Sequence, residues 1–581
     1  MLGGRPSCFA AGAQGSGRGG AATIRPMSRW NFADVWEAVA ELHPDAPALT
    51  QGSTRRTWRQ LDDRANGVAA TLLASGLDHQ AKVAQYLYNG PEYIESLFAA
   101  FKASLVPVNT NYRYTETELT YLWDNADVEA VVFHGSFAAR ADAVRASLPG
   151  IRTWLWVDDG AGPCPSWATP YEAATEAVDS SHGGPVCGPG GRSPDDLLLI
   201  YTGGTTGMPK GVMWRQDDLF AVLNQTGELR YPGDGDPATV RSILTAPAKH
   251  PPARLLPGPP LMHGTGLFTA MSVLSSAGSV VMLESRHLDI QELLDTIAAE
   301  RVTELSIVGD AFAKPILAAL DAHPGRWDIS SLWLVISSGV MWSEEVKAGL
   351  LRHQPRLIMI DSLGSSEAIG MARSRSQLGE TASTAGFQLS PDTKVLAEDG
   401  TEVVAGSGQQ GIVALRGRGP IGYYKDPDKS AATFRIIDGE RWTVPGDFAT
   451  VAADGSVRLL GRGSGCINTG GEKVFPEEVE EALKLHPAVL DAVVVGVPDE
   501  RFGETVTALV ECRSEAPNPG EEDLIGWVRE RLASYKAPRR VLPVATIGRA
   551  PNGKVDYRRL RQYAIDTVTG AGEAQPSTAT E

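Results

Sequence analysis

The stretch Tyr201-Thr202-Gly203-Gly204-Thr205-Thr206-Gly207-Met208-Pro209-Lys210-Gly211 directly follows the apolar run LLLI at 197–200. The apolar run predicts a strand that is buried on both faces, and the residues after it predict a loop. Glycines let backbone N–H groups approach phosphate oxygens, the threonines add hydroxyl donors, and Lys210 adds positive charge. A nucleotide-hydrolase P-loop needs Gly-Lys-Ser/Thr at the start of a helix. The stretch therefore predicts a phosphate-binding loop of another kind, although its glycines alone are equally typical of an ordinary turn.

Helical and strand patterns alternate on both sides of this loop. Helices are predicted over 57–76 and 91–104, with a strand over 82–88 between them. Short apolar runs predict further buried strands at 280–283 and 332–337. This alternation predicts an α/β fold class with mostly parallel strands.

The pattern changes after the glycine-rich junction GRGSGC at 461–466. A helix over 476–485, a strand over 492–497 and a helix over 521–533 predict a small α+β unit. We therefore expect a large multi-subdomain N-terminal domain with helix-covered sheets, plus a small mobile α+β C-terminal domain. The expected boundaries are a disordered N-terminal extension 1–28, a large domain 29–461, a hinge 462–466, a small domain 467–563 and a disordered tail 564–581.

The composition limits the partners and the compartment. The 581 residues carry a formal charge of −17, which argues against nucleic acid as a partner but leaves room for a small anion at a local site. Five scattered cysteines form no CxxC pair, so neither a disulfide framework nor a zinc site is expected, and a cytoplasmic location fits. The most apolar segment, 267–283, contains Gly278 and several serines, so a core helix followed by a strand is expected there and no integral membrane association.

The 201–211 stretch resembles the phosphate-binding signature of the adenylate-forming superfamily, which includes acyl-CoA synthetases, luciferases and peptide-synthetase adenylation domains. The resemblance extends from about Phe32 to Tyr557 through motifs in the family's order: Ser338-Gly339-Val340-Met341, Asp361-Ser362-Leu363-Gly364-Ser365-Ser366-Glu367, Val444-Pro445-Gly446-Asp447, 461–480 and Pro551-Asn552-Gly553-Lys554. Four positions depart from the usual pattern, namely Gly203, Leu363, Pro445 and Ser464.

The resemblance implies a set of ATP- and AMP-binding residues. Asp447 would accept hydrogen bonds from the ribose hydroxyls, Glu367 would be the Mg²⁺ ligand, and Lys554, Glu367 and Lys210 would be catalytic. The full nucleotide set implied is Thr202, Gly203, Gly204, Thr205, Thr206, Gly207, Lys210, Ser338, Gly339, Asp361, Ser366, Asp447, Arg462 and Lys554.

The same resemblance assigns roles to the hinge, the thiol channel and the acyl pocket. Ser464 would be the hinge, and Gly470 and Gly471 would border the CoA channel. His263 and Gly264 would border the acyl pocket. The resemblance also implies that His263 gates access to this pocket. A histidine here is equally typical of a structural role, so the gating role stays open at this point.

The function that the resemblance implies is ATP-dependent acid–CoA ligation through an acyl-adenylate. Its substrates and cofactors are ATP, Mg²⁺, coenzyme A and a small-molecule carboxylic acid, expected to be a medium- or long-chain fatty acid or a bulky steroid-type acid. One alternative is an acyl-AMP ligase that loads a carrier protein, another is an enzyme that passes the acyl group to a redox step, and a third is a non-catalytic ATP-binding module. A homodimer also stays open.

Overall fold

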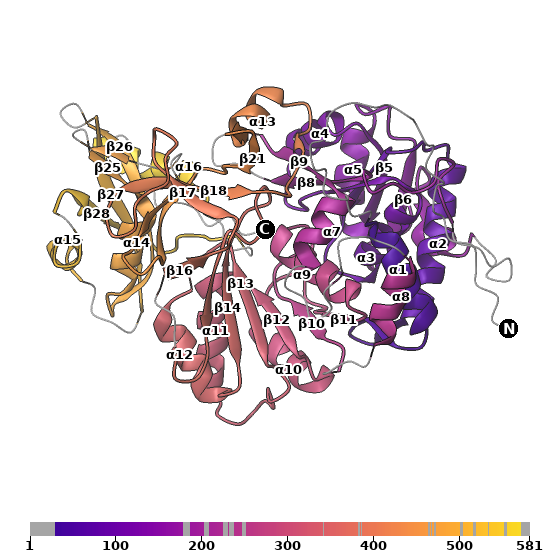
Figure 1. The fold of residues 1–581 in the computed structure, drawn as a ribbon, viewed down its shortest axis with the longest axis horizontal. Coiled ribbons are helices and arrows are strands. Elements are labelled where there is room, and N and C mark those ends of the chain that lie inside the picture. Colours follow the sequence, from indigo (N-terminus) through magenta and orange to yellow (C-terminus); the bar gives the residue numbers. More distant parts are fainter. Residues whose placement is uncertain are drawn as a thin grey trace.

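The computed structural model describes residues 30–177, 186–202, 208–224, 231, 237–246, 251–340, 342–380, 384, 386–462, 465, 467–469, 472–499, 503–514, 519–532, 534–550 and 555–570. The strands in these residues form sheets of fifteen, eight and five strands. Figure 1 shows the N-terminal part on the right in purple, and the C-terminal unit, in orange and yellow, on the left.

The eight-stranded sheet has the order β19-β9-β8-β4-β3-β5-β6-β7 and is parallel from β8 to β7. Helices cover both faces of this sheet. Successive residues of a strand point to opposite faces, so Val83 belongs to one hydrophobic core and Ala84 to another. The strands are β3 (Lys82–Tyr86), β4 (Val106–Asn109), β5 (Val128–His134), β6 (Thr153–Val157), β7 (Thr169–Pro170), β8 (Leu197–Thr202), β9 (Lys210–Arg215) and β19 (Gly422–Tyr423). The helices of this region are α1 (Phe32–Leu42), α2 (Trp58–Ala74), α3 (Pro91–Lys102), α4 (Glu116–Asn125), α5 (Ala138–Arg145) and α6 (Tyr171–Thr175).

Local signals set the ends of these helices. The Thr57 hydroxyl accepts from the Gln60 N–H, and the Gln60 side chain accepts from the Thr57 N–H, which is a capping box at the start of α2. Pro91 occupies the first position of α3, where its missing N–H has no cost. The predicted helices and the strand between them are therefore confirmed with ends shifted by a few residues.

The fifteen-stranded sheet has a parallel part and an antiparallel part. The parallel strands are β1 (Pro47–Gln51), β11 (Ser279–Met282), β10 (Arg254–Pro257), β12 (Glu304–Ile307), β13 (Leu334–Ser338) and β14 (Ile358–Leu363), with β2 (Thr54–Thr57) antiparallel at the edge. The helices are α7 (Gln216–Asn224), α8 (Pro237–Thr245), α9 (Gly264–Ser275), α10 (Ile290–Glu300), α11 (Gly309–Ala322) and α12 (Glu344–His353). Residues 267–283 form the end of a core helix and then a strand, as predicted.

The antiparallel part follows β14 and was not expected from a pattern read as mostly parallel. It contains β15 (Ala372–Ser376), β16 (Gly386–Leu389), β17 (Thr393–Leu396), β18 (Gln410–Arg416), β20 (Phe434–Ile437), β21 (Glu440–Thr443), β22 (Asp447–Val451) and β23 (Val457–Arg462), with α13 (Pro427–Thr433) between β19 and β20. Strand direction depends on connections between distant segments, which local alternation does not report.

The C-terminal unit has its own sheet, in the order β25-β24-β27-β26 with β28 beside β27. Its strands are β24 (Ile467–Thr469), β25 (Glu472–Val474), β26 (Val489–Asp499), β27 (Gly503–Cys512) and β28 (Arg540–Pro543). The core that contains α14 (Pro476–Lys484) and α15 (Glu521–Arg529) is separate from the core of α16 (Tyr557–Thr569). The predicted α/β class with a small α+β C-terminal domain is confirmed, and α16 continues past the expected boundary at 563 to Thr569.

Two observations complete the fold. Of the cysteines in the described part of the chain, Cys164 and Cys512 are free thiols, whereas Cys187 is disulfide-bonded. The spacing of cysteines along the chain did not reveal this bridge, because it says nothing about distance in the fold. None of the described helices is both long and apolar enough to cross a bilayer.

Candidate active site

A large cavity of about 2360 Å³ lies where the two large sheets and the C-terminal unit meet. Its lining comes from the β8–β9 hairpin, helix α9, the strands β12 to β14, the start of β22 and the face of the C-terminal unit near α14 and α16. The parallel strands β12 to β14 end at this cavity, which is where open α/β sheets place their ligands.

The predicted phosphate loop falls between β8 and β9, which pair antiparallel beside this cavity. Thr202, the last residue of β8, lies directly opposite Lys210, the first residue of β9, and both line the cavity. Residues 203–207 lie outside the described residues, so the structure does not place Gly203, Gly204, Thr205, Thr206 or Gly207. The Lys210 ammonium donates to Asp426 Oδ2 at 2.7 Å, and this hydrogen bond holds the pKa of the Asp426 carboxyl below its usual range.

Ser338 is the last residue of β13, Gly339 follows it, and both line the cavity. Asp361 on the neighbouring strand β14 also lines it, but its carboxylate lies 3.8 Å from the buried Lys347 ammonium of α12. Burial raises the pKa of Asp361 to about 7 and lowers the pKa of Lys347. The nucleotide contact predicted for Asp361 stays a prediction, and its neighbour Ser362 also lines the cavity.

Ser366 and Glu367 follow β14 and lie together at the cavity wall. The Ser366 carbonyl accepts from the Trp214 indole N–H at 2.9 Å, which ties this turn to strand β9. The Tyr423 hydroxyl donates to Glu367 Oε1 at 2.9 Å. Tyr423 and Asp426 were not among the predicted residues, because no sequence signal links them to Glu367 and Lys210.

Asp447 begins strand β22, and its side chain is largely buried, with 6% of the residue exposed. It lies directly opposite Arg462 in the antiparallel pair of β22 and β23. Gly446 before it has a φ of +103°, a conformation that residues with a β-carbon rarely adopt. Glycine at position 446 therefore has a geometric basis.

His263 and Gly264 stand at the start of α9. His263 is the N-cap residue, and the Asn109 side chain holds the preceding Met262 carbonyl at 2.7 Å. A β-carbon at Gly264 would lie 3.1 Å from the Phe268 ring and 3.7 Å from Ser366 Oγ. Glycine at this position therefore keeps α9 close to the turn that carries Glu367.

Four predicted residues of the hinge and the C-terminal unit lie outside the described residues, namely Ser464, Gly470, Gly471 and Lys554. The residues on either side of Lys554 line the cavity, including Arg549, Ala550, Val555 and Tyr557. Arg549 forms a two-point ion pair with Asp491 at 2.5 and 2.9 Å, and the Tyr557 hydroxyl donates to Glu480 at 3.0 Å.

Two family profiles match successive parts of the chain. The profile described as AMP-binding enzyme matches residues 36–424, and the profile of the AMP-binding enzyme C-terminal domain matches residues 478–554. The chain belongs to the AMP-binding enzyme family.

Relatives of this AMP-binding enzyme are similar to it over almost their full length. The medium/long-chain-fatty-acid–CoA/3-oxocholest-4-en-26-oate–CoA ligase of Mycobacterium marinum is 41% identical over 91% of this chain and 95% of its own. The 3-oxocholest-4-en-26-oate–CoA ligase of Rhodococcus rhodochrous is 38% identical over 95% of this chain and 99% of its own.

Solved structures share the fold. The anthranilate CoA ligase AuaEII in complex with anthranoyl-AMP superposes with a TM-score of 0.79 at 22% identity, over 94% of this chain and 99% of its own. ATP-bound MatB from Rhodopseudomonas palustris superposes with a TM-score of 0.75 at 25% identity, over 93% of this chain and 100% of its own.

The residues of this AMP-binding enzyme fit a magnesium ion held jointly with a nucleotide. Among the described residues, no group of three or more His, Cys, Asp or Glu side chains could hold a metal ion by itself. Mg²⁺ is commonly bound by one or two carboxylates together with substrate phosphate oxygens. Glu367 supplies one carboxylate at the cavity wall and meets that requirement.

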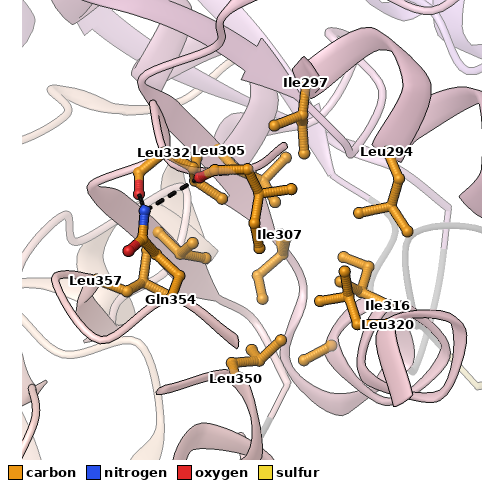
Figure 2. A pocket seen from close by; sticks show the side chains of 13 residues that line it. Leu294, Ile297, Leu305, Ile307, Ile316, Leu320, Leu332, Leu350, Gln354 and Leu357 are labelled. Atoms are coloured by element: carbon orange, nitrogen blue, oxygen red, sulfur yellow. Dashed lines mark hydrogen bonds between the residues drawn. The ribbon is translucent and has the colours of Figure 1, made fainter. Parts of the chain in front are cut away.

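A second, much smaller cavity of about 20 Å³ lies inside the core on the other face of β12 and β13 (Figure 2). Leucine and isoleucine side chains surround it, and Gln354 donates to the Leu332 and Ile329 carbonyls at 3.0 and 3.1 Å. Its volume is enough for about one water molecule. It is therefore a packing void of the AMP-binding enzyme and not an acyl site.

Proposed function

We propose that this AMP-binding enzyme is an ATP-dependent acid–CoA ligase whose acid is a medium- or long-chain fatty acid or a bulky steroid-type acid. The observation that carries this proposal is the similarity at about 40% identity, over more than nine-tenths of the chain, to ligases named for these acids. The similarity includes the C-terminal domain, which an isolated nucleotide-binding module does not need.

In the first step, an oxygen of the substrate carboxylate attacks the α-phosphorus of ATP, and the bond to the pyrophosphate oxygen breaks. The products are the acyl-adenylate and pyrophosphate. Two anions must approach each other, so positive charge and positioning are the main contributions that the protein can make. We assign these to Lys210 and Lys554, with Asp447 holding the ribose and Ser338 and Gly339 beside the adenine.

Mg²⁺, when bound, would neutralise phosphate charge during this step. Glu367 is the residue that would hold it, and the Tyr423 hydroxyl orients that carboxylate. Lys210 starts in an ion pair with Asp426, so ATP phosphate competes with Asp426 for the lysine.

In the second step, the thiol sulfur of CoA attacks the acyl carbonyl carbon, the bond from that carbon to the phosphate oxygen of AMP breaks, AMP leaves, and the thiol proton passes to the solvent. We propose that the C-terminal domain turns about Ser464 between the steps. Lys554 would then leave the site, and Gly470 and Gly471 would border the channel for the thiol, where the lack of a side chain leaves room.

The wall between α9 and the sheet supports an apolar acyl group. Phe268, Val273, Leu334, Ile336 and Ile360 all line this part of the cavity. Apolar lining with few polar groups is typical of sites for such ligands.

The test is a reaction of the purified chain with ATP, Mg²⁺, CoA and a panel of fatty acids and steroid side-chain acids. We expect AMP, pyrophosphate and the CoA thioester in equal amounts, with the thioester identified by mass spectrometry. Pyrophosphate release without a CoA thioester would favour a carrier-loading ligase. The absence of acid-dependent pyrophosphate exchange with every acid would leave only a non-catalytic ATP-binding module.

A further inference from the structure

Asp361 and Lys347 form a buried pair at the carboxyl end of strand β14. The residues in register with Asp361 on the neighbouring strands are the uncharged Ser337 and Ser374. Residues in register share a face of the sheet, and Ser337 Oγ accepts from the Gly309 N–H at 2.9 Å, where α11 begins. The Asp361 side chain therefore points to the face that α11 and α12 cover, and Asp361 also lines the active-site cavity.

Lys347 is an unusual residue for this face of the sheet. Its side chain is 1% exposed, and Val346 and Leu350 of the same helix belong to the hydrophobic core. Its ammonium lies 3.8 Å from Asp361 Oδ2 and makes no hydrogen bond within the part of the chain that the structure describes. A buried charge without close hydrogen bonds is costly, so an apolar side chain would serve packing better. The lysine therefore points to a role that it exerts through Asp361.

Two other acids beside this pair lie on the same two helices. Asp310 of α11 has its Oδ2 atom 3.3 Å from the Lys314 ammonium, and Glu344 of α12 is exposed. Burial is the main cause of the lowered pKa of Lys347, and Asp310 and Glu344 oppose it. Burial also raises the pKa of Asp361 to about 7, with Asp310 adding to the rise and Lys347 opposing it. Lys347 is therefore the main side chain that favours the ionised form of Asp361.

The adenine position proposed above lies next to Asp361. Ser338 and Gly339, assigned to the adenine, come directly after Ser337, and neighbouring strands are about 4.8 Å apart. An ionised carboxylate has acceptor sites only, whereas a protonated carboxyl also carries a donor. The ionised form matches the exocyclic amine of adenine, which is a donor. It opposes a purine whose corresponding group is a carbonyl, because that group is an acceptor.

We propose that Lys347 is a positioning residue whose ammonium keeps the Asp361 carboxylate as an acceptor for the exocyclic amine of adenine. Lys347 thereby sets the preference of the enzyme for ATP over nucleotides that carry a carbonyl at the same position. This inference rests on the proposed ligase function and on the predicted nucleotide contact of Asp361. Lys347 itself touches neither the nucleotide nor the reacting atoms.

The experiment compares ATP with inosine triphosphate, which has a carbonyl in place of the amine, by kcat/KM for pyrophosphate release at saturating acid and Mg²⁺. Wild type should prefer ATP by at least about tenfold, since a site built to bond an amine rejects an analogue that lacks it. Lys347→Met should lower this ratio by about tenfold, because a neutral carboxyl bonds the amine more weakly and can donate to the carbonyl. The change should appear in the nucleotide KM, with kcat for ATP nearly unchanged. Lys314→Met is the matched control, since it removes the lysine that pairs with Asp310, and it should keep the wild-type ratio.

The pH dependence of the same ratio separates this role from a structural one. The two triphosphate groups are identical, so their titration cancels in the ratio. In wild type, the preference for ATP should fall as the pH is lowered from about 8 to about 6, because Asp361 is ionised above its pKa of about 7 and protonated below it. Asp361→Asn does not titrate, so its ratio should stay constant over this range.

Lys347→Gln is a second neutral variant for the case in which Lys347→Met does not fold, and it should lower the ratio in the same way. Equal losses of kcat/KM for both nucleotides in a folded Lys347 variant would show a purely structural role and overturn the proposal. A wild-type ratio near one, or one that stays constant from about pH 8 to about pH 6, would overturn it whatever the variants do. If wild type releases no pyrophosphate from ATP with any acid, then the proposed ligase function fails and not only the role of Lys347.

Discussion

Asp447 and Arg462 are directly opposite each other in the antiparallel pair of β22 and β23, although each belongs to a different motif. Asp447 begins its strand and Arg462 ends the other one, next to the junction with the C-terminal unit. The sheet therefore brings two positions of the predicted nucleotide-binding set side by side.

Replacing Asp447 with alanine should raise the KM for ATP at least about tenfold. Two ribose hydroxyls lose their acceptor, and a hydrogen bond to a charged group contributes about 1.5–3 kcal/mol. Asp447→Asn retains one acceptor oxygen and should give an intermediate KM. The measurement is pyrophosphate release against ATP concentration at saturating acid. An unchanged KM in Asp447→Ala would remove this residue from the nucleotide site.

Asp426→Asn should lower the KM for ATP, by up to about fivefold. Lys210 and Asp426 are both partly exposed, and such pairs are typically worth about 0.2–1 kcal/mol, which ATP must offset when its phosphates draw on the lysine. Asparagine preserves the cap on α13, where Asp426 Oδ1 accepts from the Lys429 N–H. The check is ATP saturation kinetics together with the urea unfolding midpoint. A higher KM with normal stability would show instead that Asp426 positions Lys210 for catalysis.

Tyr423→Phe should raise the Mg²⁺ concentration needed for half-maximal activity by about three- to tenfold, since a hydrogen bond of roughly 1 kcal/mol or more to Glu367 is lost. Phenylalanine keeps the ring, which packs 5.5 Å from Phe434, so the fold should be unchanged. The measurement is initial rate against free Mg²⁺ at fixed ATP. Glu367→Gln is the companion variant, and it should lose most of the activity at any Mg²⁺ concentration. Identical Mg²⁺ curves for wild type and Tyr423→Phe would contradict the proposed orienting role.

Elements with strong local signals were predictable from the sequence. The Thr57 capping box, Pro91 at the first position of α3 and the acidic first turn of α14 all mark helix starts within a few residues. The apolar run 197–202 is also a local signal, and it predicted a buried strand. Antiparallel pairing after β14 depends on contacts between distant segments, and no short window of sequence carries that information.

The residues of the site also fall into two groups, those that stand in sequence motifs and the partners that the fold brings to them. Lys210, Glu367 and Asp447 stand in recognisable motifs, and all three line the cavity. Their partners do not stand in motifs: Asp426 is 216 residues from Lys210, and Tyr423 is 56 residues from Glu367. A single sequence shows only which residues can pair, and the fold decides which of them do. Asp361 also stands in a motif, and its partner Lys347 on α12 stands in none.

His134 should make the protein less stable as the pH falls from about 6.5 to 4. The residue is 7% exposed, its Nδ1 accepts from the Tyr88 N–H at 3.1 Å, and burial lowers its pKa from 6.5 to about 4. Below pH ~6.5 the unfolded chain binds a proton that the folded chain does not, so the free energy of unfolding decreases by about 3 kcal/mol across this range. Asp361 acts in the opposite direction, because its raised pKa favours the folded state at low pH.

The measurement for His134 is the urea midpoint at several pH values for wild type and His134→Asn. The asparagine side chain places an acceptor near the position of Nδ1 and does not titrate. The variant should therefore lose stability less steeply than wild type as the pH falls. Parallel curves for the two proteins would mean that His134 is not the source of the dependence.

Lys554→Ala should separate the two half-reactions. The lysine charge is needed when the carboxylate and the α-phosphate approach each other, and loss of one such contact typically lowers the rate by about 10²–10³. Thiol attack on a preformed acyl-adenylate brings no second anion to the phosphate. The variant should therefore fail at ATP-dependent pyrophosphate release and still convert supplied acyl-AMP and CoA to the thioester at nearly the wild-type rate.

The control for Lys554 is Lys394→Ala, which removes a lysine from an exposed ion pair with Glu402 on the antiparallel part of the large sheet. It should leave both half-reactions unchanged. A folded Lys554→Ala protein with normal pyrophosphate release would exclude the catalytic role of this lysine. A protein equally defective with supplied acyl-AMP would exclude the rotation of the C-terminal domain instead, because Lys554 would then act in both steps from one position.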